Sequence, residues 1–183
     1  MGGTIKKLSK NNEITLCVMT DGASAQYDGK KMIKVRQDAC KKAGKILGIS
    51  KFHFLNFPDM KLDSISHVEM NKELEKIIKK INPKILYSTS YNDLNKDHQK
   101  VFESCSVISR PISSKIKKFL CFEMGGRNKI PFNPNTYVDI SKELSFKLKA
   151  LNQYKTEINP FPHERSLKFI ESLSHVRGVE SGF

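Results

Sequence analysis

The fold is decided by residues 84–108, KILYSTSYNDLNKDHQKVFESCSVI, which read as strand, polar loop and helix. The apolar run Lys84–Tyr87 is typical of a buried strand. Apolar residues after Asp97 follow helical spacing until Arg110–Pro111, where a helix must stop. Hydroxyls, amides and carboxylates fill the loop between the two elements. The stretch therefore predicts a strand whose carboxyl end leads through polar side chains into a helix.

The same alternation of strand and helix runs along the rest of the chain. Apolar runs predict strands at residues 13–19, 52–55 and 116–122, and a strand or extended segment at 136–140. Amphipathic spacing predicts helices at residues 32–47, 67–81, 141–154 and 164–175, with a helix remnant at 2–10. Ser141 is expected to cap the helix that it begins. This alternation predicts an α/β fold in which a parallel sheet lies between helices and ligands bind at the carboxyl ends of the strands.

Composition excludes the fibrous, disordered and membrane-spanning classes. The chain has 183 residues, 38% of them hydrophobic and 28% charged, and no apolar run approaches the roughly 18 residues of a membrane span. Its first residues, MGGTIKKLSKNN, lack the apolar core of a signal peptide. The four cysteines are single and scattered, as in reduced proteins. We expect one domain and a cytoplasmic location.

The net charge of +13 is the one outlier of composition. A nucleic acid, an acidic lipid surface or an anionic substrate could each use the surplus. Most of it is lysine, spread from Lys6 to Lys168 without a long block, which favours a solvated surface over a polyanion groove. A nucleic-acid binder is the weakest reading, because the aromatic residues occupy core-like positions and do not alternate with lysine. We expect no specific nucleic-acid partner.

Asp97 and His98 lie at the start of the predicted helix, after the polar loop that follows the predicted strand at 84–87. An imidazole beside a carboxylate can serve as a metal ligand or as an acid/base group. The alternative is that Asp97 caps the helix and His98 is a surface residue. Asp93 and Asn95 add two further polar groups to the same loop, which favours a functional site. By contrast, Gly125–Arg127 favours a loop turn over an anion site.

Several segments together resemble one known family. Residues 87–101, YSTSYNDLNKDHQKV, resemble the DLNxDHxxV motif of the PIG-L/LmbE-like family of zinc-dependent de-N-acetylases. Further similar segments, in the family's order, are GGTIKKLSKNNEITLCVMTDG at 2–22, the RxxEAxxAxxxLG-like helix at 36–48, the FLxFPDxxLxD-like stretch at 54–63, NPNTYVDIS at 133–141, PFPHERS at 160–166 and Arg177–Gly178. The resemblance covers essentially the whole chain.

The resemblance implies a fold and a set of roles. The fold would be a Rossmann-like, three-layer α/β/α domain of LmbE-like type with a mostly parallel sheet, spanning residues 1–183. By resemblance, His98 would be a zinc ligand, and Asp97 would be a catalytic residue that holds the imidazole or tunes the local charge. Further residues would bind the substrate: Asp21, Arg36 and Asp59 at the substrate end, Asn95 where some relatives carry a second histidine, and His163. The alternative for Asp21, Arg36 and Asp59 is an ordinary place on a helix surface or a turn cap, and for His163 it is the start of a helix at Pro-His-Glu.

The sequence departs from the family pattern at its start. In the family, an HPDDE motif ahead of GGTI supplies two more zinc ligands and the general base, whereas no HxxD occurs anywhere in this sequence. The family's continuation beyond Gly182–Phe183 is absent as well. We therefore expect a domain truncated at both ends, without the family's first strand.

The expected activity is zinc-dependent removal of an N-acetyl group from a GlcNAc-containing sugar, a small-molecule partner. The basic surface favours a phosphorylated or a nucleotide- or lipid-linked form of that sugar. The alternative is a catalytically silent relative that acts as a binding or partner protein. A homo-oligomer is compatible with either function.

Overall fold

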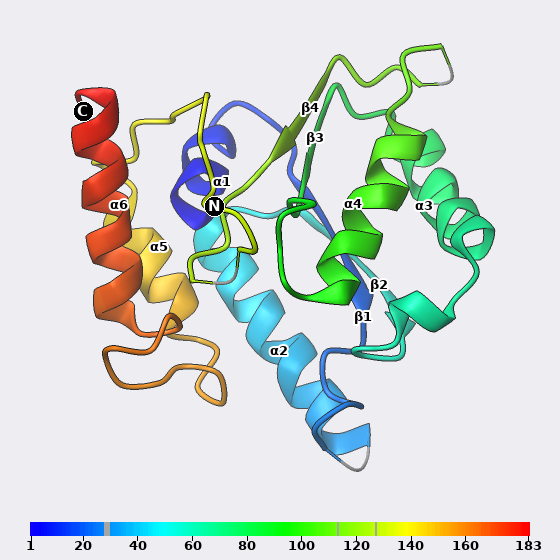
Figure 1. Ribbon diagram of the computed structural model, residues 1–183, viewed down its shortest axis with the longest axis horizontal. Coiled ribbons are helices and arrows are strands. Elements are labelled where there is room, and N and C mark those ends of the chain that lie inside the picture. The colour runs from blue at the N-terminus through cyan, green and yellow to red at the C-terminus, as the bar shows by residue number, and fades with distance from the viewer. Residues whose placement is uncertain (28–29, 113, 127) are drawn as a thin grey trace. The chain divides into compact units, whose positions relative to one another are not determined.

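The computed structural model describes residues 1–27, 30–112, 114–126 and 128–183 (Figure 1). Its contacts divide the chain into two compact units, which are described separately below. The first unit comprises Met1–Phe54 and Pro134–Phe183, and the second comprises Leu55–Asn133. Within the described ranges, the strands form two two-stranded sheets, β1 with β2 and β3 with β4.

The first unit is built mainly from helices around one small sheet. Its elements are α1 (Gly2–Leu8), β1 (Thr15–Thr20), α2 (Lys30–Leu47), the start of β2 (Lys51–Phe57), α5 (Leu144–Leu151) and α6 (Leu167–Ser181). Its core combines residues of α2, α5 and the strands: Ala43, Leu47, Ile49 and Ala150, with Ile5, Ile14, Leu16, Ile46, Phe52 and Tyr154 packed against them. The apolar face of α2 therefore holds the unit together.

Two glycines of the first unit are required by the packing. At Gly3, an added Cβ would lie 2.6 Å from Cδ1 of Ile140, so only glycine lets α1 approach that residue. At Gly48, which follows α2, φ is +83°, in the region that glycine adopts without strain. The close approach of Ile140 thus explains Gly3 of the GGTI segment, and the positive φ explains the glycine predicted to end α2.

The second unit carries the parallel strands. Its elements are the 3₁₀ turn η1 (Leu62–Ser64), α3 (His67–Ile81), β3 (Ile85–Ser88), α4 (Lys96–Ile108) and β4 (Lys118–Cys121). β3 and β4 run parallel, in a register from Ile85 opposite Lys118 to Ser88 opposite Cys121. Because α4 connects them, β3, α4 and β4 form a βαβ unit. Helix α3 packs beside α4 (Figure 1).

The structure confirms the main expectations about the elements. Helix α3 has the predicted bounds, and α2 begins two residues before its predicted start. The strands fall within or next to the predicted runs, although β2 extends on to Phe57. The expected α/β fold is confirmed, with parallel pairing seen between β3 and β4. None of the described helices combines the length and the apolar character that crossing a membrane requires.

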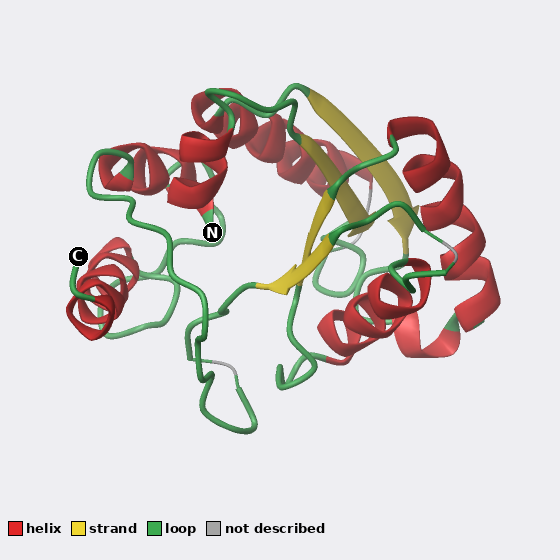
Figure 2. Ribbon diagram, turned by 90° about the horizontal axis from the view of Figure 1, so that it is seen from above, coloured by secondary structure: helices red, strands yellow, loops and turns green. Residues whose placement is uncertain are grey.

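Three local expectations in the C-terminal third are wrong. Ser141 does not cap a helix: its amide and hydroxyl donate to Oδ1 of Asp139, at 2.9 and 2.6 Å, and α5 starts only after Glu143. For residues 136–140 the strand alternative is wrong: they belong to no strand and lie in the loop before α5, where loops are green in Figure 2. Helix α6 starts at Leu167, where the hydroxyl of Ser166 accepts from the amide of Phe169.

The remaining local expectation concerns Gly125–Arg127. Arg127 lies outside the described residues, so the structure describes that predicted loop turn only in part.

Candidate functional site

The loop that follows β3 is shaped by two successive side chains. Oδ1 of Asp93 accepts from the amide of Asn95 at 2.8 Å, and Oδ1 of Asn95 accepts from the amide of Asp97 at 2.8 Å. Such side-chain-to-backbone bonds replace the helical bonds that the first amides of α4 lack. Asn95 is therefore the N-cap of α4, and the alternative in which Asp97 caps this helix is wrong.

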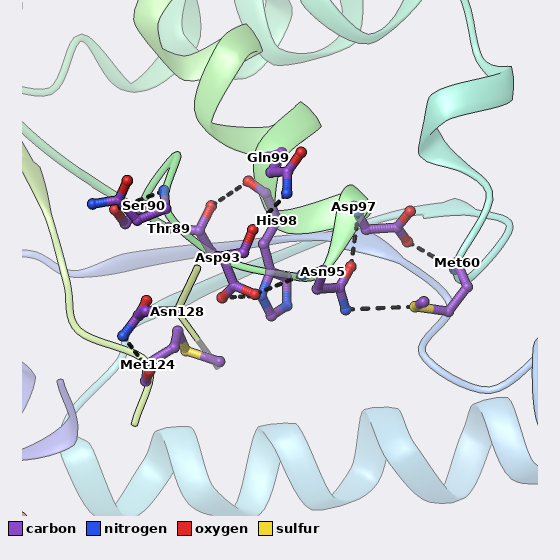
Figure 3. Close-up of polar contacts among 11 residues, drawn as sticks. Met60, Thr89, Ser90, Asp93, Asn95, Asp97, His98, Gln99, Met124 and Asn128 are labelled. Carbon is purple, nitrogen blue, oxygen red and sulfur yellow. Dashed lines mark hydrogen bonds and ion pairs between the residues drawn. The ribbon is translucent and has the colours of Figure 1, made fainter. Parts of the chain in front are cut away.

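His98 lies on the first turn of α4 and is held by Asp93. Its Nδ1 lies 2.7 Å from Oδ2 of Asp93, whose side chain is 1% exposed, whereas that of His98 is 25% exposed. The hydroxyl of Thr89 donates to the carbonyl of His98 at 2.7 Å, and Nε2 of Gln99 donates to the carbonyl of Asp93 at 2.5 Å. Figure 3 shows the imidazole against the Asp93 carboxylate. The ring is thus oriented by its own loop.

Asp97 has another function in the structure. Its Oδ2 accepts from the amide of Met60 at 2.7 Å and its Oδ1 from the amide of Leu62 at 3.0 Å, and the residue is 5% exposed. The resemblance led us to expect that Asp97 would hold the imidazole, but the structure gives that contact to Asp93. Asp97 instead fastens the segment before η1 to the start of α4 (Figure 3).

The second unit brings four of the predicted site residues into one region. Asp59 precedes Met60, whose amide is bound by Asp97. Nδ2 of Asn95 donates to the sulfur of Met60 at 3.4 Å. A thioether is a weak acceptor, so this amide keeps the capacity to donate to a bound oxygen. Asn95, Asp97 and His98 therefore lie at the start of α4, and the segment of Asp59 and Met60 is held beside it.

The other three predicted residues belong to the first unit, where Arg36 takes part in an ion-pair network. Nε of Arg36 donates to the carbonyl of Gly22 at 2.9 Å, and its guanidinium pairs with Glu157, which also pairs with Arg165. Nδ1 of His163 accepts from the amide of Arg165 at 2.9 Å. Arg36 and His163 thus belong to one polar cluster of this unit.

Asp21 lies beside that cluster and shapes its turn. Its Oδ1 accepts from the amides of Ala23 and Ser24 at 3.0 and 2.9 Å, which closes the turn that follows β1. Arg36 binds the carbonyl of Gly22, the residue that follows Asp21 in this turn.

Sequence reasoning missed two partners. Glu157, which lies far from Arg36 in the sequence, has no local pattern that could have identified it. Asp93 was recognised as a polar loop residue, but the spacing from Asp93 to His98 was not read as a contact. Five residues on a loop that turns into a helix can bring two side chains together, and this spacing was the available signal.

The described residues contain a candidate metal ligand, His98, and not a complete site. A metal-binding imidazole commonly donates its second ring N–H to a carboxylate, and His98 with Asp93 has this arrangement. Structural and catalytic zinc sites need three or four protein ligands. Over the part of the chain that the structure describes, no group of three or more histidine, cysteine or acidic side chains is placed to hold a metal ion.

Comparisons with known proteins identify a family and relatives that are similar to this sequence. A family model described as "PIG-L: GlcNAc-PI de-N-acetylase" matches residues 1–108. A diacetylchitobiose deacetylase of Thermococcus kodakarensis is 26% identical over 199 aligned positions, which cover 100% of this chain and 73% of that protein. The sequence similarity therefore spans the whole chain, in agreement with the resemblance drawn from its motifs.

Solved structures confirm the fold. An N,N'-diacetylchitobiose deacetylase from Pyrococcus horikoshii in complex with an inhibitor matches with a TM-score of 0.74 and 23% identity, over 100% of this chain and 74% of that one. The conserved protein TT1542 from Thermus thermophilus matches with a TM-score of 0.75 and 17% identity, over 99% and 81%.

A third similar structure shows that the fold alone does not identify a reaction. It is GalB, a 4-carboxy-2-hydroxymuconate hydratase from Pseudomonas putida, with a TM-score of 0.68 and 17% identity, over 98% of this chain and 80% of that one. The expected Rossmann-like, LmbE-like architecture is confirmed by these matches, and the activity rests on the family. With 108 of its 183 residues matched by the family model, this chain belongs to the PIG-L family of GlcNAc-PI de-N-acetylases.

Proposed function

We propose that this chain serves the zinc-dependent hydrolysis of the N-acetyl group of a GlcNAc-containing sugar, with His98 as one zinc ligand. The family is one of de-N-acetylases, and the relative that is similar to this chain over its whole length is a diacetylchitobiose deacetylase. Both support an amide hydrolase. The observation that carries the proposal is the imidazole of His98, bound on one side by a buried carboxylate at the end of a parallel strand. In α/β folds this edge of the sheet is where ligands bind.

The chain's own residues would hold and orient the reacting groups. His98 presents the ring nitrogen that Asp93 leaves available, and Asp97 keeps the segment at Met60 against the start of α4. The amide of Asn95 can donate to the oxygen on which negative charge develops when water attacks the acetyl carbonyl. The chemistry that zinc supplies when bound is polarisation of that carbonyl and a lower pKa of a water molecule.

Substrate recognition is proposed from the family pattern and from the net charge. Asp21, Arg36, Asp59 and His163 are proposed substrate-binding residues because they match positions of the family pattern. Arg36 is already bound to Glu157 and to the carbonyl of Gly22, so its contribution would be to shape the turn beside Asp21. The charge of +13 supports a phosphorylated or a nucleotide- or lipid-linked sugar, because a cationic surface raises the local concentration of anions.

The test combines zinc titration with an assay for released acetate. Because the described residues supply one ligand, we expect weak zinc binding by the 183-residue chain. A chain extended ahead of Met1 by the family's HPDDE segment should bind one zinc ion tightly and release acetate from N-acetylglucosaminyl substrates. In that extended chain, His98→Ala should abolish stoichiometric zinc binding, whereas His175→Ala, at an exposed position of α6, should retain it. Full zinc content in His98→Ala, or no acetate from the extended chain, would contradict the proposal.

A second candidate function is a binding or partner protein without catalysis. It is favoured by one observation, the lack of a three-donor group among the described residues. In this case the extended chain would bind zinc without releasing acetate, and the 183-residue chain would still bind N-acetylated sugars. Equilibrium binding of N-acetylglucosamine to both chains separates the two functions.

A further inference from the structure

The carboxylate of Asp93 is buried and uses its two oxygens for different partners. Oδ1 accepts from the amide of Asn95 at 2.8 Å, and Oδ2 lies 2.7 Å from Nδ1 of His98. The side chain is 1% exposed, so these protein donors take the place of solvent. A carboxylate so buried is stabilised only where donors meet its oxygens.

This pairing distinguishes the two nitrogens of the imidazole. An ionised carboxylate has no proton to give, so the nitrogen that faces it must carry one. Nδ1 of His98 therefore donates, and in the neutral ring Nε2 is left with its lone pair. Within the residues that the structure describes, Nε2 has no hydrogen-bond partner, and the ring is 25% exposed. The lone pair is thus the part of His98 that an incoming group can meet.

The backbone around the pair leaves the ring little freedom. The amide of Asp93 donates to the carbonyl of Ser90 at 3.3 Å, and Asp93 forms an antiparallel bridge with Asn128. On the other side, the carbonyl of His98 accepts from the hydroxyl of Thr89 at 2.7 Å. Both residues of the pair are therefore held by the loop, as Figure 3 shows.

From this geometry we propose that Asp93 is a positioning residue, which holds His98 in the tautomer protonated on Nδ1 and so directs the Nε2 lone pair to whatever His98 binds. The tautomer stands on the contacts of the loop alone. That a metal ion is the group bound at Nε2 rests on the proposed function. Asp97, the acidic neighbour of His98 in the sequence, does not fill this role, because its oxygens are taken by the amides of Met60 and Leu62.

The geometry makes a sharp prediction for Asp93→Asn. The amide oxygen of the new side chain must still face the N–H of Asn95, since the opposite orientation would set two donors against each other. Its NH₂ group then occupies the position of Oδ2 and donates to Nδ1 of His98. Nδ1 gives up its proton to solvent and Nε2 takes one up, so the neutral ring keeps one proton but changes tautomer. A substitution that preserves size and shape thereby removes the lone pair from Nε2.

The test is the nitrogen NMR spectrum of the 183-residue chain labelled with ¹⁵N-histidine, recorded at alkaline pH without added metal. The chain has five histidines, and the signals of His98 are those that disappear from the spectrum of His98→Gln. The wild-type chain should show His98 with a protonated Nδ1 and an unprotonated Nε2, and Asp93→Asn should show the reverse. Asp97→Asn is the matched control, because it alters another buried carboxylate of the loop and should leave the His98 tautomer as in the wild type.

Two results would overturn this assignment: Nε2 protonated in the wild-type chain, or an unchanged tautomer in Asp93→Asn. If Asp93→Asn fails to fold, the wild-type spectrum decides by itself. Failure of the proposed function is separate, because it would appear as missing zinc affinity or acetate release while the tautomer is as expected.

Discussion

At the scale of single residues, the start of α4 depends on short polar side chains that bind backbone amides. Asp93 and Asn95 each accept from the amide two residues further along the chain. These bonds set the direction in which α4 leaves the loop, and with it the direction of His98. The candidate site is therefore built from local backbone contacts.

Asn95→Ala should lower the free energy of unfolding by about 1 kcal/mol, because the amide of Asp97 loses its acceptor and α4 loses its N-cap. Asn95→Ser, which keeps a capping oxygen, should remain near the wild-type value. Urea denaturation of the three chains measures the difference. Equal losses in both variants would instead mean that the contact of the Asn95 amide with Met60 matters more than the cap.

At the scale of elements, Arg36 joins three segments of the first unit. It lies on α2, binds the carbonyl of Gly22 in the turn after β1, and pairs with Glu157, which follows α5. Both charged side chains are mostly buried, at 16% and 18% exposed, so their attraction is screened less than that of a surface pair. The arrangement indicates a structural cross-link beside Asp21.

Arg36→Met should lower the free energy of unfolding by about 1–3 kcal/mol, because Glu157 keeps only Arg165 as a partner and the carbonyl of Gly22 loses its donor. Lys34→Met, which removes a positive charge from an exposed position of the same helix, should change stability by less than about 0.5 kcal/mol. Thermal and urea unfolding measure both. Were Arg36 only a substrate contact, its variant would raise KM in the active chain and leave stability unchanged.

At the scale of the whole molecule, the packing buries several weakly acidic side chains. Burial raises the pKa of the Cys40, Cys105 and Cys121 thiols, because a charged thiolate is poorly solvated in the interior. The pKa of the Tyr87 phenol is raised by burial as well, and that of Tyr154 by burial and by its hydrogen bond with Cys40. The folded chain therefore retains protons that the unfolded chain releases at alkaline pH.

The free energy of unfolding should consequently fall as the pH rises above the ordinary thiol pKa of 9.0. Below this value both states are protonated and these groups contribute no pH dependence. Above it the unfolded state binds fewer protons than the folded state, so stability decreases until the folded groups also ionise. Urea unfolding between about pH 7 and pH 10 measures the slope. The double variant Cys40→Ala, Cys105→Ala should show a shallower slope, and an unchanged slope would contradict this explanation.

Local signals explain how much of the fold was predictable. Helix α3 has its predicted bounds because its apolar spacing lies within the segment and the break at Asn82–Pro83 follows it directly. Gly48 likewise marks the end of α2 through its own backbone preference. Ser141 shows the limit: it has the composition of a cap, but Asp139, two residues earlier, takes its hydroxyl and amide. A propensity cannot tell which of two nearby partners a hydroxyl will choose.

By itself, the sequence determined the α/β class, the order of the elements and the region of His98, because hydrophobic periodicity, turn residues and motif spacing act over short stretches of chain. The tertiary structure alone decided which carboxylate holds the imidazole. Asp97 is next to His98 in the sequence, but the amides of Met60 and Leu62 bind it, and the loop instead folds Asp93 against the ring. The tertiary structure also decided the pairing of Arg36 with Glu157, because their segments meet only when the chain is folded. Such contacts depend on where backbone segments come together in space, which no local pattern records.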